Sequence, residues 1–259
     1  MTLARTEAWW VTGAGSGIGN ALAQRLAQIG HTVYASSRSE SALLELSQRY
    51  ANVIPLPVDV SDRAAMQRVF TVCKRPPTHL DGIILSAGIC EYVDLPDLNT
   101  PAITAQMQIN FLGAVHACEV ALPLLEAAAV FSRPQLVGIG SLSSLIGFPR
   151  AEGYGASKAA MAYFLDSLRC DIQQRIQVTT VYPGFVKTRL TAANDFPMPF
   201  VWELDQAADH ILERLWQERR VITFPWQLSL ILRVAQLLPS LWYGYLIPRL
   251  SRQSNGASS

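Results

Sequence analysis

Strand-length apolar runs alternate with segments of helical periodicity along most of this sequence, and this alternation constrains the fold more than any other feature. Strands are predicted at residues 8–12, 31–36, 53–57, 81–86, 135–140 and 178–182. Helices are predicted at residues 17–29, 39–50, 62–74, 100–130 and 153–174, with a break near 110–113. Near-continuously apolar strands separated by helices are typical of a parallel sheet covered on both faces. We therefore predict an α/β fold with a doubly wound parallel sheet in a single domain.

Length and charge limit the classes of protein that fit. The chain has 259 residues, half of them apolar, which is enough for one large domain. Its 21 Lys and Arg are spread among 20 Asp and Glu without a basic run, so nucleic acid is not predicted as a partner. The four cysteines lie far apart, so we expect buried free thiols and no metal site. The first seven residues lead directly into the first strand, from which we expect a cytoplasmic protein.

A glycine-rich turn, Thr-Gly-Ala-Gly-Ser-Gly-Ile-Gly at residues 12–19, joins the first predicted strand to the first predicted helix. Gly13 suits a tight turn, Gly17 lets backbone approach phosphates, and Gly19 allows close packing of helix on strand. The free N–H groups at the start of such a helix attract anions. A dinucleotide pyrophosphate is therefore expected here, contacted by Gly13, Gly15, Ser16, Gly17, Ile18 and Gly19.

The end of the second predicted strand bears on the choice of nicotinamide cofactor. An acidic residue about 20 positions beyond the last glycine would bind a ribose 2′-hydroxyl, but Ser37 and Arg38 stand there instead. A hydroxyl and a guanidinium accommodate a 2′-phosphate. We therefore predict NADP(H), with NAD(H) less favoured. The alternative for Arg38 is a solvated surface charge.

Tyr154 and Lys158 have the spacing that places two side chains on one face of a helix. A phenol with its ordinary pKa of about 10 is a weak acid–base catalyst near neutrality. A neighbouring ammonium favours the phenolate, so we expect Lys158 to lower the pKa of Tyr154. Taken alone, this spacing also fits an ordinary surface pair, and the surrounding residues decide between the two interpretations.

These residues resemble the short-chain dehydrogenase/reductase family, in its compact single-domain type. The glycine turn matches the family pattern T-G-x-x-x-G-I-G, and the tyrosine and lysine match its Y-x-x-x-K. A serine segment at residues 140–149 precedes the tyrosine, and the family spacing of thirteen positions selects Ser141 over Ser143 and Ser144. The resemblance extends from Trp9 to about Thr191 and implies a Rossmann-like fold.

The resemblance also implies roles for residues outside the tyrosine helix. Asn110 corresponds to a helix asparagine that supports a water link to the lysine, and the hydroxyl of Ser141 would stabilise a developing alkoxide. Asp59 corresponds to an acid that contacts adenine, although it also fits a helix cap close to Asp62. The cofactor residues implied in this way are Asp59, Val60, Ser86, Ala87, Gly88, Tyr154, Lys158, Pro183, Gly184, Val186 and Thr188.

One segment departs from the family pattern. Ser86-Ala87-Gly88 stands where the family usually has N-A-G. Serine is shorter than asparagine, so we expect the bond that steadies the adjoining strand to be lost or replaced by water. This concerns stability, because the missing amide is not a proton-transfer group.

The resemblance implies an NADP(H)-dependent oxidoreductase that interconverts a carbonyl and a primary or secondary alcohol, with hydride from the nicotinamide and a proton from Tyr154. The second hypothesis is a catalytically silent NADP(H)-binding sensor or scaffold, against which stand the four catalytic candidates Asn110, Ser141, Tyr154 and Lys158. A lipophilic substrate is favoured by a set of apolar residues, for which core packing is the alternative. They are Leu190, Phe196, Pro197, Met198, Pro199, Phe200 and Trp202. The family association is typically a homodimer, and a tetramer stays open.

We divide the chain into a Rossmann-type catalytic domain over residues 1–223, an apolar C-terminal extension over 224–250 packed on it, and a disordered tail over 251–259. A substrate lid is predicted at about 187–204. Prolines divide the extension into pieces too short to span a bilayer. Its Trp, Tyr and Arg residues fit peripheral membrane contact, and the alternatives are a cover over the cleft or a subunit interface.

Overall fold

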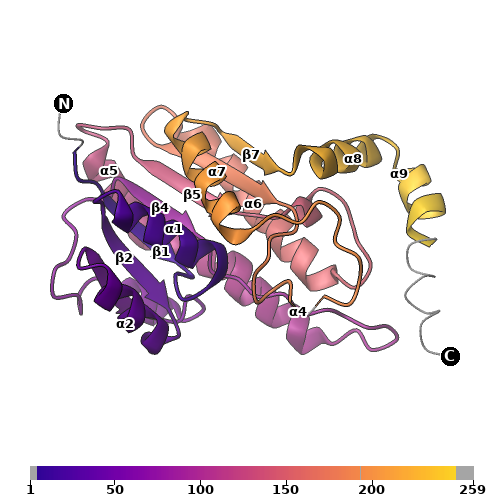
Figure 1. The fold of residues 1–259 in the computed structure, drawn as a ribbon, viewed down its shortest axis with the longest axis horizontal. Helices are drawn as coiled ribbons and strands as arrows, with labels where there is room; N and C mark the ends of the chain where they lie inside the picture. The colour runs from indigo at the N-terminus through magenta and orange to yellow at the C-terminus, as the bar shows by residue number, and fades with distance from the viewer. Residues whose placement is uncertain (1–4, 193, 249–259) are drawn as a thin grey trace.

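Seven strands lie in one sheet in the order β3-β2-β1-β4-β5-β6-β7, and every neighbouring pair is parallel. The computed structural model describes residues 5–192 and 194–248, and it confirms the predicted doubly wound α/β fold. Helices cover both faces of the sheet (Figure 1). The strand order changes direction between β1 and β4, which is where ligands bind in open sheets of this kind.

The strands and helices occupy most of the predicted ranges. The strands are β1 (Ala8–Thr12), β2 (Thr32–Ser37), β3 (Val53–Pro57), β4 (Gly82–Leu85), β5 (Gln135–Ile139), β6 (Gln177–Pro183) and β7 (Val221–Phe224). The helices up to β6 are α1 (Gly17–Gln28), α2 (Glu40–Arg49), α3 (Arg63–Gln67), α4 (Thr100–Gln106), η1 (Met107–Leu112), α5 (Gly113–Ala128), η2 (Leu142–Ser144) and α6 (Glu152–Ile172). Beyond β6 come α7 (Leu204–Trp216), α8 (Trp226–Leu237), α9 (Pro239–Leu241) and η3 (Trp242–Leu246).

Two apolar layers flank the sheet, because successive side chains of a strand point to opposite faces. On one face, Trp9 packs with Leu22 of α1 and Ile211 of α7. On the other face, Trp10 packs with Leu125 of α5. Alternate residues of β1 thus pack against the helices on opposite faces of the sheet, which fixes β1 between the two helical layers.

Trp9 and Gly82 are in close contact where β1 and β4 begin. A Cβ at Gly82 would overlap the six-membered ring of Trp9. The indole Nε1 of Trp9 donates to Glu7 at 2.7 Å, and Trp216 packs edge-on with a centroid separation of 5.8 Å. The glycine therefore makes room for a fixed tryptophan.

The predicted helix over 62–74 is shorter in the structure, where α3 ends at Gln67 and turns follow. The Thr71 N–H bonds the Arg68 carbonyl three residues back, and the Thr71 hydroxyl donates to the same oxygen at 2.7 Å. The Val72 N–H also reaches this carbonyl at 3.4 Å, so three donors share one acceptor in the turns that follow α3. At the other edge of the sheet, β7 is a strand that was not predicted from the sequence.

The long helical stretch between β4 and β5 is continuous, but it changes from α-helical to π-helical pitch at η1, where a break was predicted. A π-helical turn widens the helix locally and is frequent at functional sites. The stretch Thr100–Ala128 is the one helix among the described residues that is long and apolar enough to cross a membrane. Its residues Ala117, Ala121 and Leu125 are buried in the core beside the sheet, which accounts for its apolar composition.

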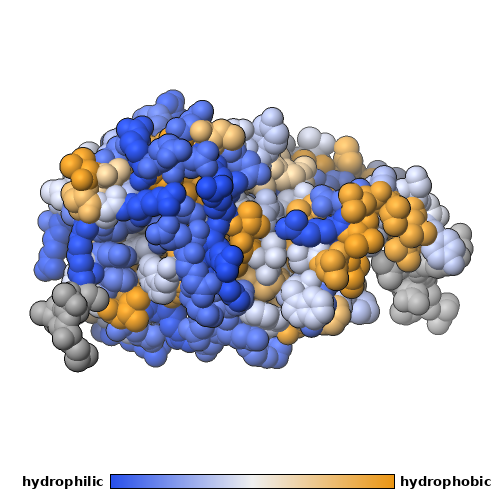
Figure 2. Space-filling model, turned by 90° about the horizontal axis from the view of Figure 1, so that it is seen from above, coloured by the Kyte–Doolittle hydropathy of each residue, from blue (hydrophilic) through white to orange (hydrophobic). Residues whose placement is uncertain are grey.

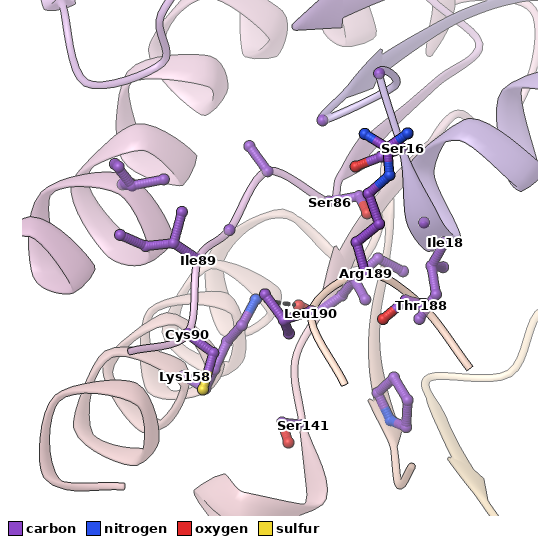
Figure 3. Close-up of a pocket in the computed structure, with 18 of the residues that line it drawn as sticks. Ser16, Ile18, Ser86, Ile89, Cys90, Ser141, Lys158, Thr188, Arg189 and Leu190 are labelled. Atoms are coloured by element: carbon purple, nitrogen blue, oxygen red, sulfur yellow. Dashed lines mark hydrogen bonds between the residues drawn. The ribbon is translucent and has the colours of Figure 1, made fainter. Parts of the chain in front are cut away.

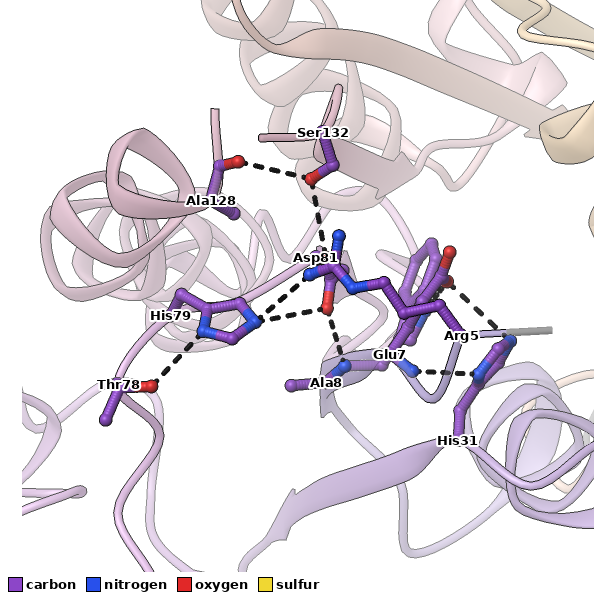
Figure 4. Close-up of polar contacts among 10 residues, drawn as sticks. Arg5, Glu7, Ala8, His31, Thr78, His79, Asp81, Ala128 and Ser132 are labelled. Carbon is purple, nitrogen blue, oxygen red and sulfur yellow. Dashed lines mark hydrogen bonds and ion pairs between the residues drawn. The ribbon is translucent and has the colours of Figure 1, made fainter. Parts of the chain in front are cut away.

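A polar cluster joins the amino ends of β1 and β4 (Figure 4). The carboxylate of Asp81, only 5% exposed, accepts from Arg5 and from the Ala8 N–H, each at 2.9 Å. His79 and Ser132 lie at 3.6 and 3.5 Å from the same carboxylate. An arginine, a histidine, a hydroxyl and a backbone N–H surround one buried carboxylate and fix the end of the sheet that is opposite the glycine turn.

Residues 226–246, called the C-terminal arm below, project from one end of the molecule (Figure 1). Leu232 and Trp242 pack on Leu142 and Ile146. The backbone of Gly147 holds the arm further, because its carbonyl accepts from the Trp242 indole and its N–H donates to the Tyr243 hydroxyl, each at 3.1 Å. The predicted tail over 251–259 lies outside the described residues.

The cysteines differ from the expectation of four buried thiols. Cys118 is buried, Cys73 and Cys90 are partly buried, and Cys170 is exposed. Cys170 lies on α6 with its Sγ 3.4 Å from the Asp166 carbonyl of the same helix. The expectation is wrong for Cys170 because an apolar sequence neighbourhood does not decide which side of a helix faces solvent.

Candidate active site

A cavity of about 520 Å³ opens at the carboxyl ends of the strands. The catalytic candidates Ser141, Tyr154 and Lys158 line it. The predicted cofactor residues that line it are Gly13, Gly15, Ser16, Gly17, Ile18, Ser37, Arg38, Asp59, Val60, Ser86, Ala87, Gly88, Pro183, Gly184, Val186 and Thr188. Gly19 and Asn110 do not line the cavity, but each lies close to residues that do. The structure therefore brings nearly all of the predicted site to one place.

The glycine turn has the backbone geometry that its sequence predicts. Gly13 and Gly17 have φ angles of +71° and +57°, in the left-handed region that favours glycine. A Cβ on Gly13 would lie 2.6 Å from the Ala87 nitrogen, and one on Gly19 would lie 2.6 Å from the Gly13 carbonyl oxygen. Ser16 occupies the N-cap position of α1, and its side chain makes no capping hydrogen bond. The turn thus presents the amino end of a helix to the cavity, where an anion is favoured.

Ser37 and Arg38 lie at the carboxyl end of β2 and face the same cavity. Arg38 is exposed, and its positive charge acts on Asp59. Burial alone would raise the pKa of Asp59, but hydrogen bonds from Ser61 and the charge of Arg38 lower it overall. Helix α3 is capped by Asp62, whose carboxylate accepts from the Ala65 N–H, so Asp59 does not have the capping role that was its alternative.

Tyr154 and Lys158 lie one turn apart on α6, and Ser141 follows β5 opposite them. Ser141 hydrogen-bonds the phenol of Tyr154. Ser141 also accepts from the backbone N–H and the hydroxyl of Ser143, at 3.1 and 2.9 Å. The ammonium of Lys158 donates to the Ile139 carbonyl at 2.8 Å. The lysine is thus anchored to the end of β5, and Ser141 lies two residues beyond the end of that strand.

Burial governs the titration of Tyr154 and Lys158. It raises the pKa of Tyr154 to about 12, against the effect of the Ser141 hydrogen bond. It lowers the pKa of Lys158 to about 8. Burial therefore outweighs any lowering by a neighbouring ammonium, so the net shift of the Tyr154 pKa is opposite in direction to the one expected from Lys158 alone.

Asn110 lies in η1 and is fully buried. Its amide exchanges two hydrogen bonds with the Ile89 backbone, at 2.8 and 2.9 Å, and donates to Ser157 at 2.9 Å. A Cβ on Gly88 would lie 3.2 Å from Asn110 Oδ1 and 3.4 Å from Lys158 Nζ. Asn110 therefore joins the segment after β4 to the tyrosine helix and lies close to the lysine.

Thr12 bonds the backbone at the segment where Ser86 departs from the family pattern. The Thr12 hydroxyl donates to the Ile84 carbonyl at 3.3 Å and accepts from the N–H groups of Ser86 and Ala87 at 3.2 and 3.4 Å. These bonds connect β1 to the segment after β4 through backbone groups and do not involve the Ser86 side chain. The expected loss of an asparagine bond therefore stays a prediction.

Several cavity residues lie outside the predicted set, including Ile89, Cys90, Arg189 and Thr191. Cys90 lies beside Lys158, and Arg189 extends across the cavity toward Ser16 (Figure 3). Burial raises the pKa of the Cys90 thiol, so it faces the lysine as a neutral group. These residues follow the motifs directly in the sequence, and extending each motif by three residues would have found them.

The loop over 187–204 has fixed ends and several side-chain contacts. Val186 pairs with Trp202, and the Lys187 N–H donates to the Trp202 carbonyl at 3.0 Å. Tyr92 donates to Asn194 at 2.6 Å, and Arg150 binds Asp195 at 2.7 Å. The loop thus closes on the segment that follows β4.

The apolar residues that were predicted to favour a lipophilic substrate divide into two groups. Leu190 lines the cavity, and Phe196 packs edge-on against Tyr92 with a centroid separation of 5.7 Å. Trp202 instead packs at 4.8 Å from Phe224 against the core. The alternative of core packing therefore applies to Trp202.

Comparison with known proteins gives a consistent family. A family model described as short chain dehydrogenase matches residues 7–196. An uncharacterized oxidoreductase from Myxococcus xanthus is 33% identical over 235 residues, which are 89% of this chain and 92% of that protein. The 11-beta-hydroxysteroid dehydrogenase A of Sesamum indicum is 30% identical over 83% of this chain and 60% of that protein.

Solved structures show the same architecture. The crystal structure of a short chain dehydrogenase/reductase from Burkholderia phymatum in complex with NAD has a TM-score of 0.83 at 19% identity, covering 93% of this chain and 97% of that one. Family model, relatives and fold agree with the site described above, and the chain belongs to the short-chain dehydrogenase/reductase family. It is an oxidoreductase by that membership.

Proposed function

We propose that this protein is an NADP(H)-dependent oxidoreductase that interconverts a carbonyl and an alcohol on a lipophilic small molecule. The observation that carries the proposal is that Ser141, Tyr154 and Lys158 line the same cavity as the glycine turn. A dinucleotide that starts at the turn and follows the strand ends would reach these three side chains. The protein is cytoplasmic in this proposal.

Each side chain of this site has its own role in the proposed reaction. When bound, a nicotinamide supplies the hydride for reduction of a carbonyl carbon or takes it up in the reverse direction. Tyr154 gives its phenolic proton to the carbonyl oxygen as the alcohol forms. Ser141, already bonded to that phenol, stabilises the charge that develops on the same oxygen. The ammonium of Lys158, fixed by Ile139, favours the phenolate left after proton transfer.

The choice of NADP(H) depends on the cationic and hydroxyl groups around the cavity. Ser37 and Arg38 lie where a 2′-phosphate would be placed, and no carboxylate stands at their positions. A guanidinium binds phosphate through charge-assisted hydrogen bonds. Arg189, which extends toward Ser16 (Figure 3), would place a second guanidinium against the pyrophosphate. The Burkholderia phymatum protein is described with NAD, but at 19% identity it supports the fold alone.

The substrate class follows from the side of the cavity that faces away from the glycine turn. Ile89, Cys90 and Leu190 give it a largely apolar lining. Such a lining favours a lipophilic carbonyl or alcohol. The name of the Sesamum indicum relative, a hydroxysteroid dehydrogenase, is consistent with this class.

The test is a panel of lipophilic ketones and aldehydes followed by NADPH absorbance and repeated with NADH. We expect turnover with NADPH on at least one member of the panel. Tyr154→Phe should lower kcat by roughly 10² to 10⁴, because it removes the proton donor, while NADPH binding by titration calorimetry changes little. Tyr163→Phe is the matched control, since Tyr163 is on the same helix but 77% exposed.

Each outcome of these experiments tests a different part of the proposed function. Unchanged turnover by Tyr154→Phe would remove Tyr154 from the reaction. A strong preference for NADH would overturn the roles of Ser37 and Arg38. Tight NADPH binding without turnover of any panel member would favour a sensor or scaffold in place of the enzyme.

A further inference from the structure

Helix α8 has an apolar stripe on its solvent side. Trp226, Leu230, Val234 and Leu237 are spaced by four, four and three residues, and they are 68%, 55%, 47% and 80% exposed. This spacing places them on one face of the helix. The opposite face carries Leu232 and packs on the catalytic domain. The stripe is therefore not the surface that attaches the helix to the protein.

The remainder of the C-terminal arm continues this surface. Leu238, Leu241, Tyr243, Tyr245 and Leu246 are between 39% and 51% exposed. Figure 2 shows apolar side chains gathered at the end of the molecule where Figure 1 places α8 and α9. Monomeric soluble proteins rarely expose contiguous apolar patches of this kind, and larger ones mark contact sites.

All of the charged side chains in the C-terminal part of the sequence are positive. From residue 221 to residue 259 the sequence contains Arg233, Arg249 and Arg252 but no Asp, Glu or Lys. Arg233 is exposed and follows Leu230 by three positions, which places it along the stripe. A long side chain at this position can lay its stem on apolar surroundings and hold its guanidinium at a polar boundary.

We propose that the C-terminal arm docks on the surface of an anionic lipid bilayer. Exposed apolar residues with Trp and Tyr at the boundary and arginine as the only charge are the features of a helix that lies in a membrane interface. With 12 residues, α8 is too short to span the hydrocarbon core, so the arm lies on the bilayer. The contacts of Gly147 with Trp242 and Tyr243 hold the arm in the position in which the stripe is presented.

Charge complementarity favours a lipid surface over a second copy of the chain. In a twofold contact the same patch meets itself, so Arg233 of one arm would lie at the same interface as Arg233 of the other. Like charges brought together at an interface are unfavourable. The headgroups of an anionic bilayer supply the opposite charge instead.

The proposal is tested by flotation with vesicles of phosphatidylcholine alone and of phosphatidylcholine and phosphatidylglycerol in equal amounts. The full chain should float with the anionic vesicles and much less with the neutral ones. Replacing Leu230 and Leu237 together by Glu should lower the bound fraction roughly tenfold or more, since both apolar area and charge change. Arg233→Gln should weaken binding to the anionic vesicles only.

Matched controls are Val72→Glu and Val130→Glu, because these side chains are 79% and 85% exposed and lie outside the arm. Both should float like the original protein. Sedimentation velocity and circular dichroism establish whether each variant is folded and whether its association state has changed. The proposal is overturned if the original protein ignores anionic vesicles, or if the arm variant floats normally. It is also overturned if the arm variant only converts an oligomer to a monomer. None of these results depends on turnover.

Discussion

Lys158 is held in surroundings that disfavour its charge. The side chain is 4% exposed, and its pKa falls from 10.5 to about 8 on burial. A pKa change of this size corresponds to roughly 3 kcal/mol of unfavourable free energy for the charged form. The hydrogen bond to the Ile139 carbonyl offsets about 1 kcal/mol of this free energy. The site therefore holds a cation at a net cost in stability.

We expect Lys158→Met to be about 1 to 2 kcal/mol more stable than the original protein at pH 7, and inactive, as urea unfolding and the ketone assay would measure. The gain should shrink between pH 8 and 10.5, because there the folded protein has released the lysine proton and the unfolded chain still holds it. Stability of the original protein rises with pH in that window. Lys187→Met is the control, since Lys187 is 63% exposed and paired with Glu203. Equal or lower stability of Lys158→Met at pH 7 would contradict this interpretation.

At this scale, spacing and motif were enough to place Tyr154, Lys158 and Ser141 in one cavity, because a four-residue interval on a helix and a strand end have fixed geometry. The direction in which the pKa of Tyr154 shifts could not be predicted. It depends on how deeply the phenol is buried, which no residue spacing contains.

Among the elements, the loop over 187–204 is tied to the catalytic domain chiefly through Arg150. Its guanidinium contacts Asp94 at 2.6 Å and Asp195 at 2.7 Å, and it lies 5.0 Å from the centroid of the Tyr92 ring. Arg150 has a φ of +65°, a conformation that is uncommon for a residue with a side chain. One arginine thus joins the loop to the segment after β4.

Arg150→Met should open this loop more often without unfolding the protein. Each pair is partly exposed and contributes at most about 1 kcal/mol, so limited proteolysis between residues 188 and 199 should become roughly fivefold faster at unchanged melting temperature. Arg175→Met, which removes the exposed pair with Glu126, is the control and should leave the cleavage rate unchanged. Equal cleavage of the two variants would assign the closure of the loop to its apolar contacts.

Element prediction from the sequence succeeded where the periodicity was long. An irregularity near Asn110 was predicted as a break, whereas the structure has a π-helical turn in a continuous helix, because the pitch is set by how η1 packs against α6. Trp202 could equally have faced the substrate or the core. The pairing of Val186 with Trp202 decides this, and it joins residues that no periodic pattern links.

At the scale of the whole molecule, we expect two copies to associate through α5 and α6. Tyr163 on α6 is 77% exposed, a high exposure for an aromatic side chain in the middle of a long helix. Buried aromatic residues supply much of the energy of protein interfaces.

Tyr163→Arg should raise the dissociation constant of the dimer roughly tenfold or more, measured by sedimentation equilibrium across a dilution series. Leu44→Arg is the control, because Leu44 is 45% exposed on α2 at the other side of the sheet. A dimer equally stable in both variants would place the interface elsewhere.

The contact between Trp9 and Gly82 sets a limit on how this chain can change over evolutionary time. A side chain at position 82 cannot be accepted while the tryptophan is in place, and a smaller residue at position 9 would leave a void beneath Trp216. Each change alone is destabilising, whereas the two together exchange volume between neighbouring strands. Substitutions at these two positions are therefore expected to be inherited as a pair.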